Sequence, residues 1–299
     1  MSITEVTGIR EIETLYLQLL FRCNFSCAHC FHGENLKRKE RISRQDAAEI
    51  MQYFVHNHRT SQVVLLGGEP FLHSDIADIT ADAHNLDLRT EICTNGHGIF
   101  RRKLPALVGR LDHLRVSLDG LQPAHDEIRT TGSFYDAIET IEYAVDLGFR
   151  VGVTMTITSL NVDDLPELVD LLADRGVASL KLHQLRLVGN ARRNAHLELL
   201  DAEAVKASLN ACSDQLPLQL DDDLLAASSA VACGAAEQGQ HLDRIEMTPA
   251  GGLTMSCKAV GKDAHAFVWD FTKGQVAHRP TDHDEVLLGI PQVNYVAKA

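Results

Sequence analysis

Two hydrophobic periodicities alternate along the first two thirds of the chain. Short apolar stretches rich in β-branched residues predict strands, and longer stretches with apolar positions three and four apart predict amphipathic helices. The predicted strands cover residues 15–21, 62–67, 89–95, 114–120, 150–158 and 179–188. The predicted helices between them cover residues 43–58, 74–86, 100–111, 134–148 and 162–176.

Local signals support several of these boundaries. Ser43 is a suitable N-cap, Pro105 stands near the start of a short helix, and Gly148 and Gly176 end the helices before them. Six β/α repeats in series predict an α/β fold with a parallel sheet and right-handed crossovers. Because a complete barrel has eight repeats, we expect a partial (β/α)6 TIM-type barrel with functional groups at the carboxyl ends of its strands.

The repeat pattern is expected to stop after about residue 216. Residues 201–215 predict one more helix, and residues 244–259 predict a β-hairpin that turns around Pro249 to Gly252. No element is assigned to residues 260–299. We therefore expect a core partial barrel over residues 1–200 and a small C-terminal α/β extension over 201–299 that covers the active site.

Composition and charge narrow the range of possible functions. With 299 residues and 45% hydrophobic content, the chain can bury a sizeable core. Its 41 acidic and 28 basic residues give a net charge of −13, which disfavours nucleic acid and anionic membranes as partners. A charged N-terminus and the absence of long apolar stretches predict no signal peptide, no membrane span and a cytoplasmic location with reduced thiols. The acidic excess is compatible with a cationic small molecule, or it serves only solubility.

Three of the seven cysteines form a compact group directly after the first predicted strand. Cys23, Cys27 and Cys30 stand in the stretch "CNFSCAHCF". A structural zinc site needs four ligands, usually from two paired motifs, and no partner motif exists. Three thiolates on one loop suit a [4Fe–4S] cluster in which one iron has no protein ligand. The spacing therefore predicts an iron–sulfur site at the active rim of the barrel.

The C-x3-C-x2-C spacing resembles the signature of the radical S-adenosylmethionine (SAM) superfamily. The resemblance implies that the open iron binds the amine and carboxylate of SAM. It also implies an external one-electron donor, such as flavodoxin or ferredoxin, whose electron cleaves SAM and yields a 5′-deoxyadenosyl radical that abstracts hydrogen from the substrate. Within the cysteine loop, His29 occupies the position that lies beside the adenine in this family, although a solvent-facing histidine remains the alternative.

Further motifs extend the resemblance over about residues 14–195. "GGEP" would contact the methionine amine, with Glu69 as charge partner of the ammonium, and "TNG" ends the next strand. "SLDG" and "HDEIR" resemble the motifs that contact the ribose, through Ser117 and Asp119, and the carboxylate, through Arg129. "RLVGN" stands where the family contacts adenine. The resemblance implies these SAM contacts: His29, Phe31, Gly67, Gly68, Glu69, Pro70, Thr94, Asn95, Ser117, Asp119, Arg129 and Val188.

The remaining cysteines bear on the fate of the substrate radical. Cys233 and the G-x4-C from Gly252 to Cys257 resemble the first half of a SPASM or twitch extension, but no cysteine follows Cys257. A complete pair of auxiliary clusters is therefore excluded. One auxiliary cluster held by Cys212, Cys233 and Cys257 stays open. Cys93, in the middle of a predicted strand, is expected to be a small buried hydrophobic residue.

Without an auxiliary cluster, a thiol has another use. Because an S–H bond is weaker than a typical C–H bond, a cysteine can give a hydrogen atom to a carbon radical, and delivery to the opposite face inverts the centre. Cys257 is the predicted catalytic donor and Cys233 the second choice; the alternative for Cys257 is a small buried residue.

The substrate is expected to be small and cationic. Only a short segment precedes the first predicted strand, so no peptide-leader domain is expected. Carboxylates in several acidic segments could receive ammonium groups. These are 220–225, Asp243, Glu246, Asp282 and Asp284. In its length, its missing auxiliary cysteines and its charge, the chain resembles aminoglycoside epimerases of the neomycin type. The alternatives are a twitch-type dehydrogenase with one auxiliary cluster and a peptide-modifying maturase.

Overall fold

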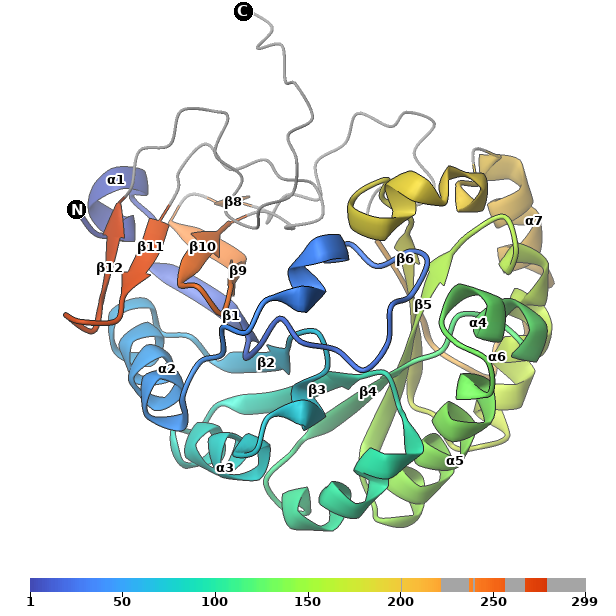
Figure 1. Ribbon diagram of the computed structural model, residues 1–299, viewed down its shortest axis with the longest axis horizontal. Helices are drawn as coiled ribbons and strands as arrows, with labels where there is room; N and C mark the ends of the chain where they lie inside the picture. Colours follow the sequence, from blue (N-terminus) through green and yellow to red (C-terminus); the bar gives the residue numbers. More distant parts are fainter. Residues whose placement is uncertain (200, 222–236, 239, 256–266, 279–299) are drawn as a thin grey trace, which may run out of the picture.

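The computed structural model describes residues 1–199, 201–221, 237–238, 240–255 and 267–278. Within these residues, twelve strands form one curved sheet in the order β12-β11-β10-β9-β1-β2-β3-β4-β5-β6-β7, with β8 paired to β9 (Figure 1). The strands are β1 (Glu11–Gln18), β2 (Gln62–Leu66), β3 (Arg89–Thr94), β4 (His113–Ser117), β5 (Arg150–Ile157), β6 (Ser179–Gln184), β7 (Leu218–Leu220), β8 (Glu237–Gln238), β9 (His241–Met247), β10 (Gly252–Thr254), β11 (Phe267–Asp270) and β12 (Gln275–His278).

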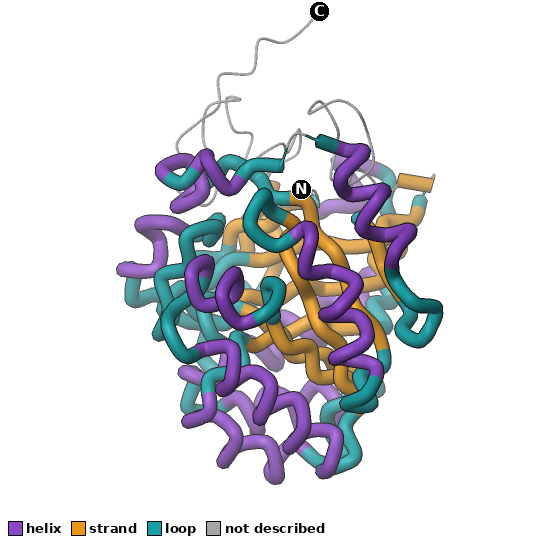
Figure 2. The backbone as a smooth tube through the Cα atoms, turned by 90° about the vertical axis from the view of Figure 1, so that its right-hand side faces the viewer, coloured by secondary structure: helices purple, strands orange, loops and turns teal. Residues whose placement is uncertain are grey.

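Helices cover the outer face of this sheet, and Figure 2 shows them wrapped around the strands. The α-helices are α1 (Ile3–Thr7), α2 (Arg44–His58), α3 (Ile76–Asn85), α4 (Gln122–Ile128), α5 (Ser133–Asp146), α6 (Leu165–Ala173) and α7 (Ala202–Ala211). The 3-10 helices are η1 (Gly33–Lys37), η2 (Pro70–Leu72), η3 (Gly98–Leu107), η4 (Val162–Asp164), η5 (Gly189–Arg193) and η6 (Ala195–Leu197). None of the helices in the described part of the chain combines the length and apolarity of a membrane span.

The predicted α/β partial barrel is confirmed, and its sheet stays open. All six predicted strands are present and parallel, and Ser43 caps α2 by accepting a hydrogen bond from the Asp46 amide. The parallel array is longer than predicted, because β7 adds to β6 and β9 adds to β1. The expectation that the repeat stops near residue 216 was therefore wrong. A three-residue strand is too short to show a periodicity.

Other differences have local causes. The helix predicted over 100–111 is the 3-10 helix η3, in which Pro105 lacks the amide that an α-helix requires. The predicted hairpin is confirmed as β9 and β10, paired through Met247 and Leu253. Helices α1 and α4 and strands β7, β8, β11 and β12 were not predicted. The sheet is continuous across residue 200, and the division into two domains stays a prediction.

The two faces of the parallel strands differ in polarity. In β4, Leu114 and Val116 are fully buried in the apolar core beneath the helices. Arg115 and Ser117 alternate with them and face the concave side. Strands buried on both faces usually read as nearly continuous apolar stretches. The alternation means that the concave face of this sheet, the lumen of the partial barrel, has a polar wall.

Candidate active site

The loop after β1 gathers three free thiols. Cys23, Cys27 and Cys30 form no disulfide, and Cys27 is only 7% exposed. Burial raises the pKa of Cys23 to about 11 and that of Cys27 to about 12, and it also raises the pKa of Cys30. The charges of Cys23 and Cys30 further raise the pKa of Cys27, because the three sulfurs lie near one another. Protons on such buried thiols leave when a metal centre supplies compensating positive charge.

Two glycines allow neighbouring turns to approach this loop closely. A Cβ atom on Gly68, after β2, would lie 2.3 Å from the carbonyl oxygens of Phe21 and Arg22. A Cβ on Gly189, after β6, would lie 2.4 Å from the carbonyl oxygen of Cys30. Any larger residue would push the turn away from the loop. Gly68 was predicted as a SAM contact, and Gly189 was quoted only within the RLVGN motif.

The turn after β6 also binds the loop through hydrogen bonds. The Asn190 amide donates to the Cys30 carbonyl at 2.8 Å, and its side chain donates to the Cys27 carbonyl at 3.0 Å. Asn194 donates in the same way to the Ala28 carbonyl at 3.1 Å. Val188, the predicted adenine contact, is buried immediately before this turn. The conformation of the cysteine loop therefore depends on residues more than 150 positions away in the sequence.

Glu69 joins the GGEP turn to the TNG turn. Its carboxylate accepts hydrogen bonds from the Phe71 amide at 3.0 Å, the Thr94 hydroxyl at 2.9 Å and the Asn95 amide at 2.8 Å. Complete burial raises the pKa of this carboxyl to about 7, although these hydrogen bonds act in the opposite direction. The Asn95 side chain continues toward the cysteine loop, 3.8 Å from the Cys23 sulfur. Three of the predicted residues thus form one connected group.

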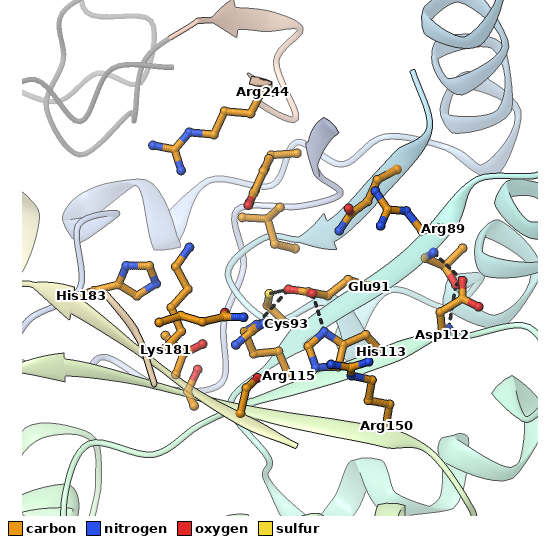
Figure 3. A pocket seen from close by; sticks show the side chains of 18 of the residues that line it. Arg89, Glu91, Cys93, Asp112, His113, Arg115, Arg150, Lys181, His183 and Arg244 are labelled. Carbon is orange, nitrogen blue, oxygen red and sulfur yellow. Dashed lines mark hydrogen bonds and ion pairs between the residues drawn. The ribbon is translucent and has the colours of Figure 1, made fainter. Parts of the chain in front are cut away.

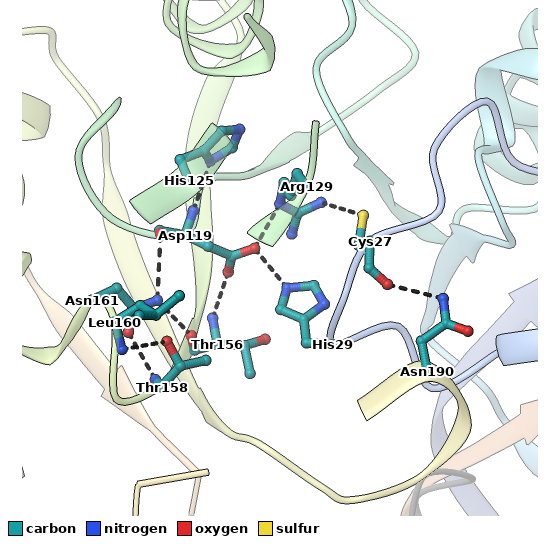
Figure 4. Close-up of polar contacts among 10 residues, drawn as sticks. All are labelled: Cys27, His29, Asp119, His125, Arg129, Thr156, Thr158, Leu160, Asn161 and Asn190. Carbon is teal, nitrogen blue, oxygen red and sulfur yellow. Dashed lines mark hydrogen bonds and ion pairs between the residues drawn. The ribbon is translucent and has the colours of Figure 1, made fainter. Parts of the chain in front are cut away.

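Asp119 forms a second connected group, shown in Figure 4. Its Oδ2 accepts hydrogen bonds from Arg129 Nε and His29 Nε2, each at 2.6 Å, and its Oδ1 accepts one from the Thr156 amide at 2.8 Å. Arg129 Nη1 lies 4.0 Å from the Cys27 sulfur. His29 is thus held against a buried carboxylate and is not a solvent-facing residue. The structure brings together His29, Asp119, Arg129 and the cysteine loop, and their contact with SAM stays a prediction.

Electrostatics favour the charged form of Asp119. Burial alone would raise the pKa of its carboxyl, but Arg129 and His29 hold that pKa well below the ordinary range. His125 accepts a hydrogen bond from the Asp119 amide at 3.0 Å, and burial lowers its pKa to about 3, so the ring stays neutral. Asn161 donates to the Asp119 carbonyl at 3.3 Å. His125 was quoted only within a motif, and no sequence signal pointed to Asn161.

A cavity of about 630 Å³ occupies the lumen beside these groups (Figure 3). Phe31 and Ser117, two of the predicted SAM contacts, line it. Cys93 lines it as well and contacts the Glu91 carboxylate at 3.6 Å, so the expectation of a merely hydrophobic residue was wrong. Burial and the Glu91 charge raise the pKa of the Cys93 thiol. Alternation in β3 places Cys93 on the polar face of the sheet.

The wall of this cavity carries a buried ion-pair network. Glu91 accepts from His113 at 2.6 Å and from Arg115 at 3.0 Å. Burial alone would raise the pKa of Glu91, but these two partners lower it to about 2. A Cβ on Gly152 would lie 2.7 Å from the His113 ring and 3.2 Å from the Arg115 guanidinium, so this glycine leaves room for both side chains.

The cysteine loop has a donor set suited to an iron–sulfur cluster. Three thiols and no fourth sulfur in that loop match a cluster with one iron free of protein sulfur. Arg129 supplies positive charge beside them. Residues 17–172 match the family described as the Radical SAM superfamily. The chain belongs to this superfamily. Radical SAM proteins bind a [4Fe–4S] cluster and SAM, and these are the cofactors of this chain.

Characterised relatives carry varied activities. The chain is 27% identical over 190 residues to Fe-coproporphyrin III synthase of Methanosarcina barkeri, covering 62% of this chain and 47% of the relative. It is 29% identical over 188 residues to the mycofactocin maturase MftC of Mycolicibacterium smegmatis, covering 61% and 47%. The chain thus spans about half the length of the curated relatives it matches.

Solved structures share the radical SAM fold. SuiB of Streptococcus suis bound to S-adenosylmethionine superimposes with a TM-score of 0.71 at 16% identity, covering 95% of this chain and 67% of SuiB. The structure of anSMEcpe with bound AdoMet gives a TM-score of 0.60 at 14% identity, covering 81% and 73%. At these identities the likeness establishes the fold alone.

Of the three cysteines considered for an auxiliary cluster, the structure describes only Cys212. Cys212 follows α7, and its thiol donates to the Ser208 carbonyl at 3.3 Å. Cys233 and the predicted hydrogen donor Cys257 lie outside the described residues. Among the predicted acidic contacts, Asp221 pairs with His183 at 2.7 Å and Glu246 accepts from Gln18 at 2.5 Å. Asp282 and Asp284 lie outside the described residues.

Proposed function

We propose that this chain cleaves SAM reductively and uses the resulting 5′-deoxyadenosyl radical to abstract hydrogen from a substrate held in the lumen. The observation that carries the proposal is the convergence of the three-thiol loop and the Asp119–Arg129 pair at the carboxyl ends of the strands, beside the lumen cavity. When bound, the cluster supplies the electron that cleaves SAM. An external donor such as flavodoxin or ferredoxin would reduce it.

Some of the predicted residues would contact the cluster or SAM directly, and others would hold those contacting residues in position. Cys23, Cys27 and Cys30 would hold the cluster. Arg129 retains guanidinium nitrogens beyond the one bound to Asp119 and would bind the SAM carboxylate. Ser117, which lines the cavity, would contact the ribose.

Other predicted residues would contact the adenine and the amine of SAM. Phe31, His29 and Val188 would lie beside adenine, and the turn of Gly67, Gly68 and Pro70 would receive the amine. Two carboxylates take a different role from the one first expected. Glu69 and Asp119 each accept three hydrogen bonds from protein groups. We propose that they hold the Thr94–Asn95 turn and the His29–Arg129 pair in position.

Peptides recur as substrates among the proteins that this chain resembles. SuiB has been crystallised with the precursor peptide SuiA, and anSMEcpe with the Cp18Cys peptide. The relatives include the sporulation killing factor maturation protein SkfB and the mycofactocin maturase MftC. Neither the comparisons nor the described residues support an aminoglycoside epimerase, an auxiliary cluster or a SPASM-type extension. We therefore propose peptide modification ahead of the epimerase or dehydrogenase of sequence analysis.

The test is anaerobic reconstitution followed by quantification of 5′-deoxyadenosine after reduction. Wild-type protein and Cys212→Ala should form it, and the Cys27→Ala variant should not. Formation of 5′-deoxyadenosine by Cys27→Ala would refute the assignment. Incubation with short peptides encoded beside the gene, in D2O, then tests the substrate class. A SAM-dependent mass change in such a peptide supports it, and a turnover of sugars alone contradicts it.

A further inference from the structure

The lumen wall is positively charged in a chain that is strongly negative. Five basic side chains line the cavity against three carboxylates. The whole chain has a net charge of −13. The basic residues are Arg89, Arg115, Arg150, Lys181 and Arg244, and the acidic ones are Glu91, Asp112 and Glu246. Acidic residues are therefore concentrated elsewhere, and the lumen does not offer the surface that a cationic substrate would need.

The three carboxylates of the wall already have protein partners. Glu91 accepts from His113 and Arg115, and Asp112 accepts from the amide and hydroxyl of Thr90 at 2.7 and 3.0 Å. Glu246 accepts from the Gln18 side chain at 2.5 Å. Little carboxylate capacity thus remains for ammonium groups of a ligand.

Lys181 differs from Arg89 and Arg115, which pair with Glu13 and Glu91. It lies in the middle of β6, on the polar face, with Thr154 and Gln219 as its neighbours across the strands. Among the described residues, no carboxylate lies within 4 Å of its ammonium and no hydrogen bond engages it. A half-buried ammonium without such a partner is costly unless an anion joins it.

Arg244 faces Lys181 from the other side of the lumen. It lies on β9, which joins the opposite end of the parallel array, and the curvature of the sheet brings both residues to one cavity. Figure 3 shows both side chains directed into the same space, next to His183. Arg244 lies over the Tyr16 ring at 5.8 Å, which restricts its position. His183 pairs with Asp221 at 2.7 Å, and the charges of Lys181 and Arg244 also lower the pKa of the Asp221 carboxyl.

We propose that Lys181 and Arg244 bind an oxyanionic group of the substrate, a carboxylate or a phosphate, and hold it in the lumen. This inference rests on the proposed function, because it places the substrate in the lumen. A guanidinium and an ammonium that converge from two walls bind an oxyanion by charge-assisted hydrogen bonds. In a peptide substrate the group would be an acidic side chain or the terminal carboxylate.

The experiment measures binding calorimetrically on the reconstituted holoprotein with SAM present. Glutarate represents a carboxylate, inorganic phosphate represents a phosphate, and spermidine represents the opposite charge. Wild-type protein should bind glutarate or phosphate and not spermidine. Lys181→Gln should weaken that binding about tenfold, and Lys181→Arg should retain it. The preferred anion identifies the source of the oxyanion.

Lys206→Gln is the matched control, because Lys206 pairs with Glu203 on the exposed surface of α7. It should bind the anion as the wild type does. Equal anion binding by wild type and Lys181→Gln, equal weakening in Lys206→Gln, no anion binding by the wild type, or binding of spermidine would each overturn the proposal. Reductive SAM cleavage, measured on the same samples, should be unchanged in Lys206→Gln. Its absence from wild type would instead refute the proposed function.

Discussion

Arg129 donates a hydrogen bond from Nε to Oδ2 of Asp119 at 2.6 Å, and the two side chains are only 9% and 0% exposed. The pair connects the end of α4 to the end of β4, and its guanidinium lies 4.0 Å from the Cys27 sulfur. A buried ion pair of this kind contributes little compared with an apolar pair, but the loss of one member leaves a buried charge without a partner. Its value to this protein lies in fixing the position of Arg129.

Asp119→Asn should destabilise the protein by about 3–5 kcal/mol, because Arg129 then keeps its charge without a carboxylate. Denaturant unfolding measures this loss, and SAM affinity should fall in parallel. The control is Glu11→Gln, which removes the partner of an exposed arginine, Arg59, and should cost at most about 1 kcal/mol. Equal losses of unfolding free energy in the two variants would show that burial does not set the cost of breaking the Asp119–Arg129 pair.

Because of Glu91, the free energy of unfolding should depend on pH in the acid range. Its pKa in the folded protein is about 2, below the ordinary 4.5, so its ionised form stabilises the fold above about pH 4.5. That stabilisation, about 3 kcal/mol, is lost as the pH falls from about 4.5 toward 2. Unfolding free energies across this range should show a smaller slope in Glu91→Gln than in wild type. Glu13→Gln, at an exposed pair with Arg89, should keep the wild-type slope.

Gly189→Ala should disrupt the cysteine loop. The new Cβ would meet the Cys30 carbonyl oxygen at 2.4 Å, and the backbone has φ +58°. Gly109 has φ +76° with no atom within 4 Å of a Cβ, so Gly109→Ala carries only the backbone cost of about 1 kcal/mol. Iron content after reconstitution should fall in Gly189→Ala and stay at the wild-type level in Gly109→Ala. Full iron content in both would contradict the close approach.

Iron and sulfide content also separates one cluster from two. Reconstituted wild-type protein should hold about four irons per chain, and the Cys23, Cys27 and Cys30 triple alanine variant should hold none. About eight irons in the wild type, or about four in the triple variant, would reveal an auxiliary cluster. Substitution of Cys233 and Cys257 would then identify its ligands.

Local patterns in the sequence are sufficient to predict the class of fold and the class of chemistry. Strand and helix periodicities are local, so the six β/α units could be read directly, and the three cysteines follow one another within a single loop. The carboxyl ends of parallel strands meet at one edge of the sheet, which is why His29, Asp119 and Arg129 could be assigned to one site from the sequence.

The groups that these residues contact depend on the folded arrangement of the whole chain. The carboxylate of Glu69 was expected to meet SAM, and it accepts hydrogen bonds from Phe71, Thr94 and Asn95. The Lys181–Arg244 arrangement depends on the curvature of the whole sheet, which brings β6 and β9 to one cavity. Net charge averages over the entire surface and therefore suggested a cationic ligand, whereas the charge of the lumen depends on which face each strand residue occupies.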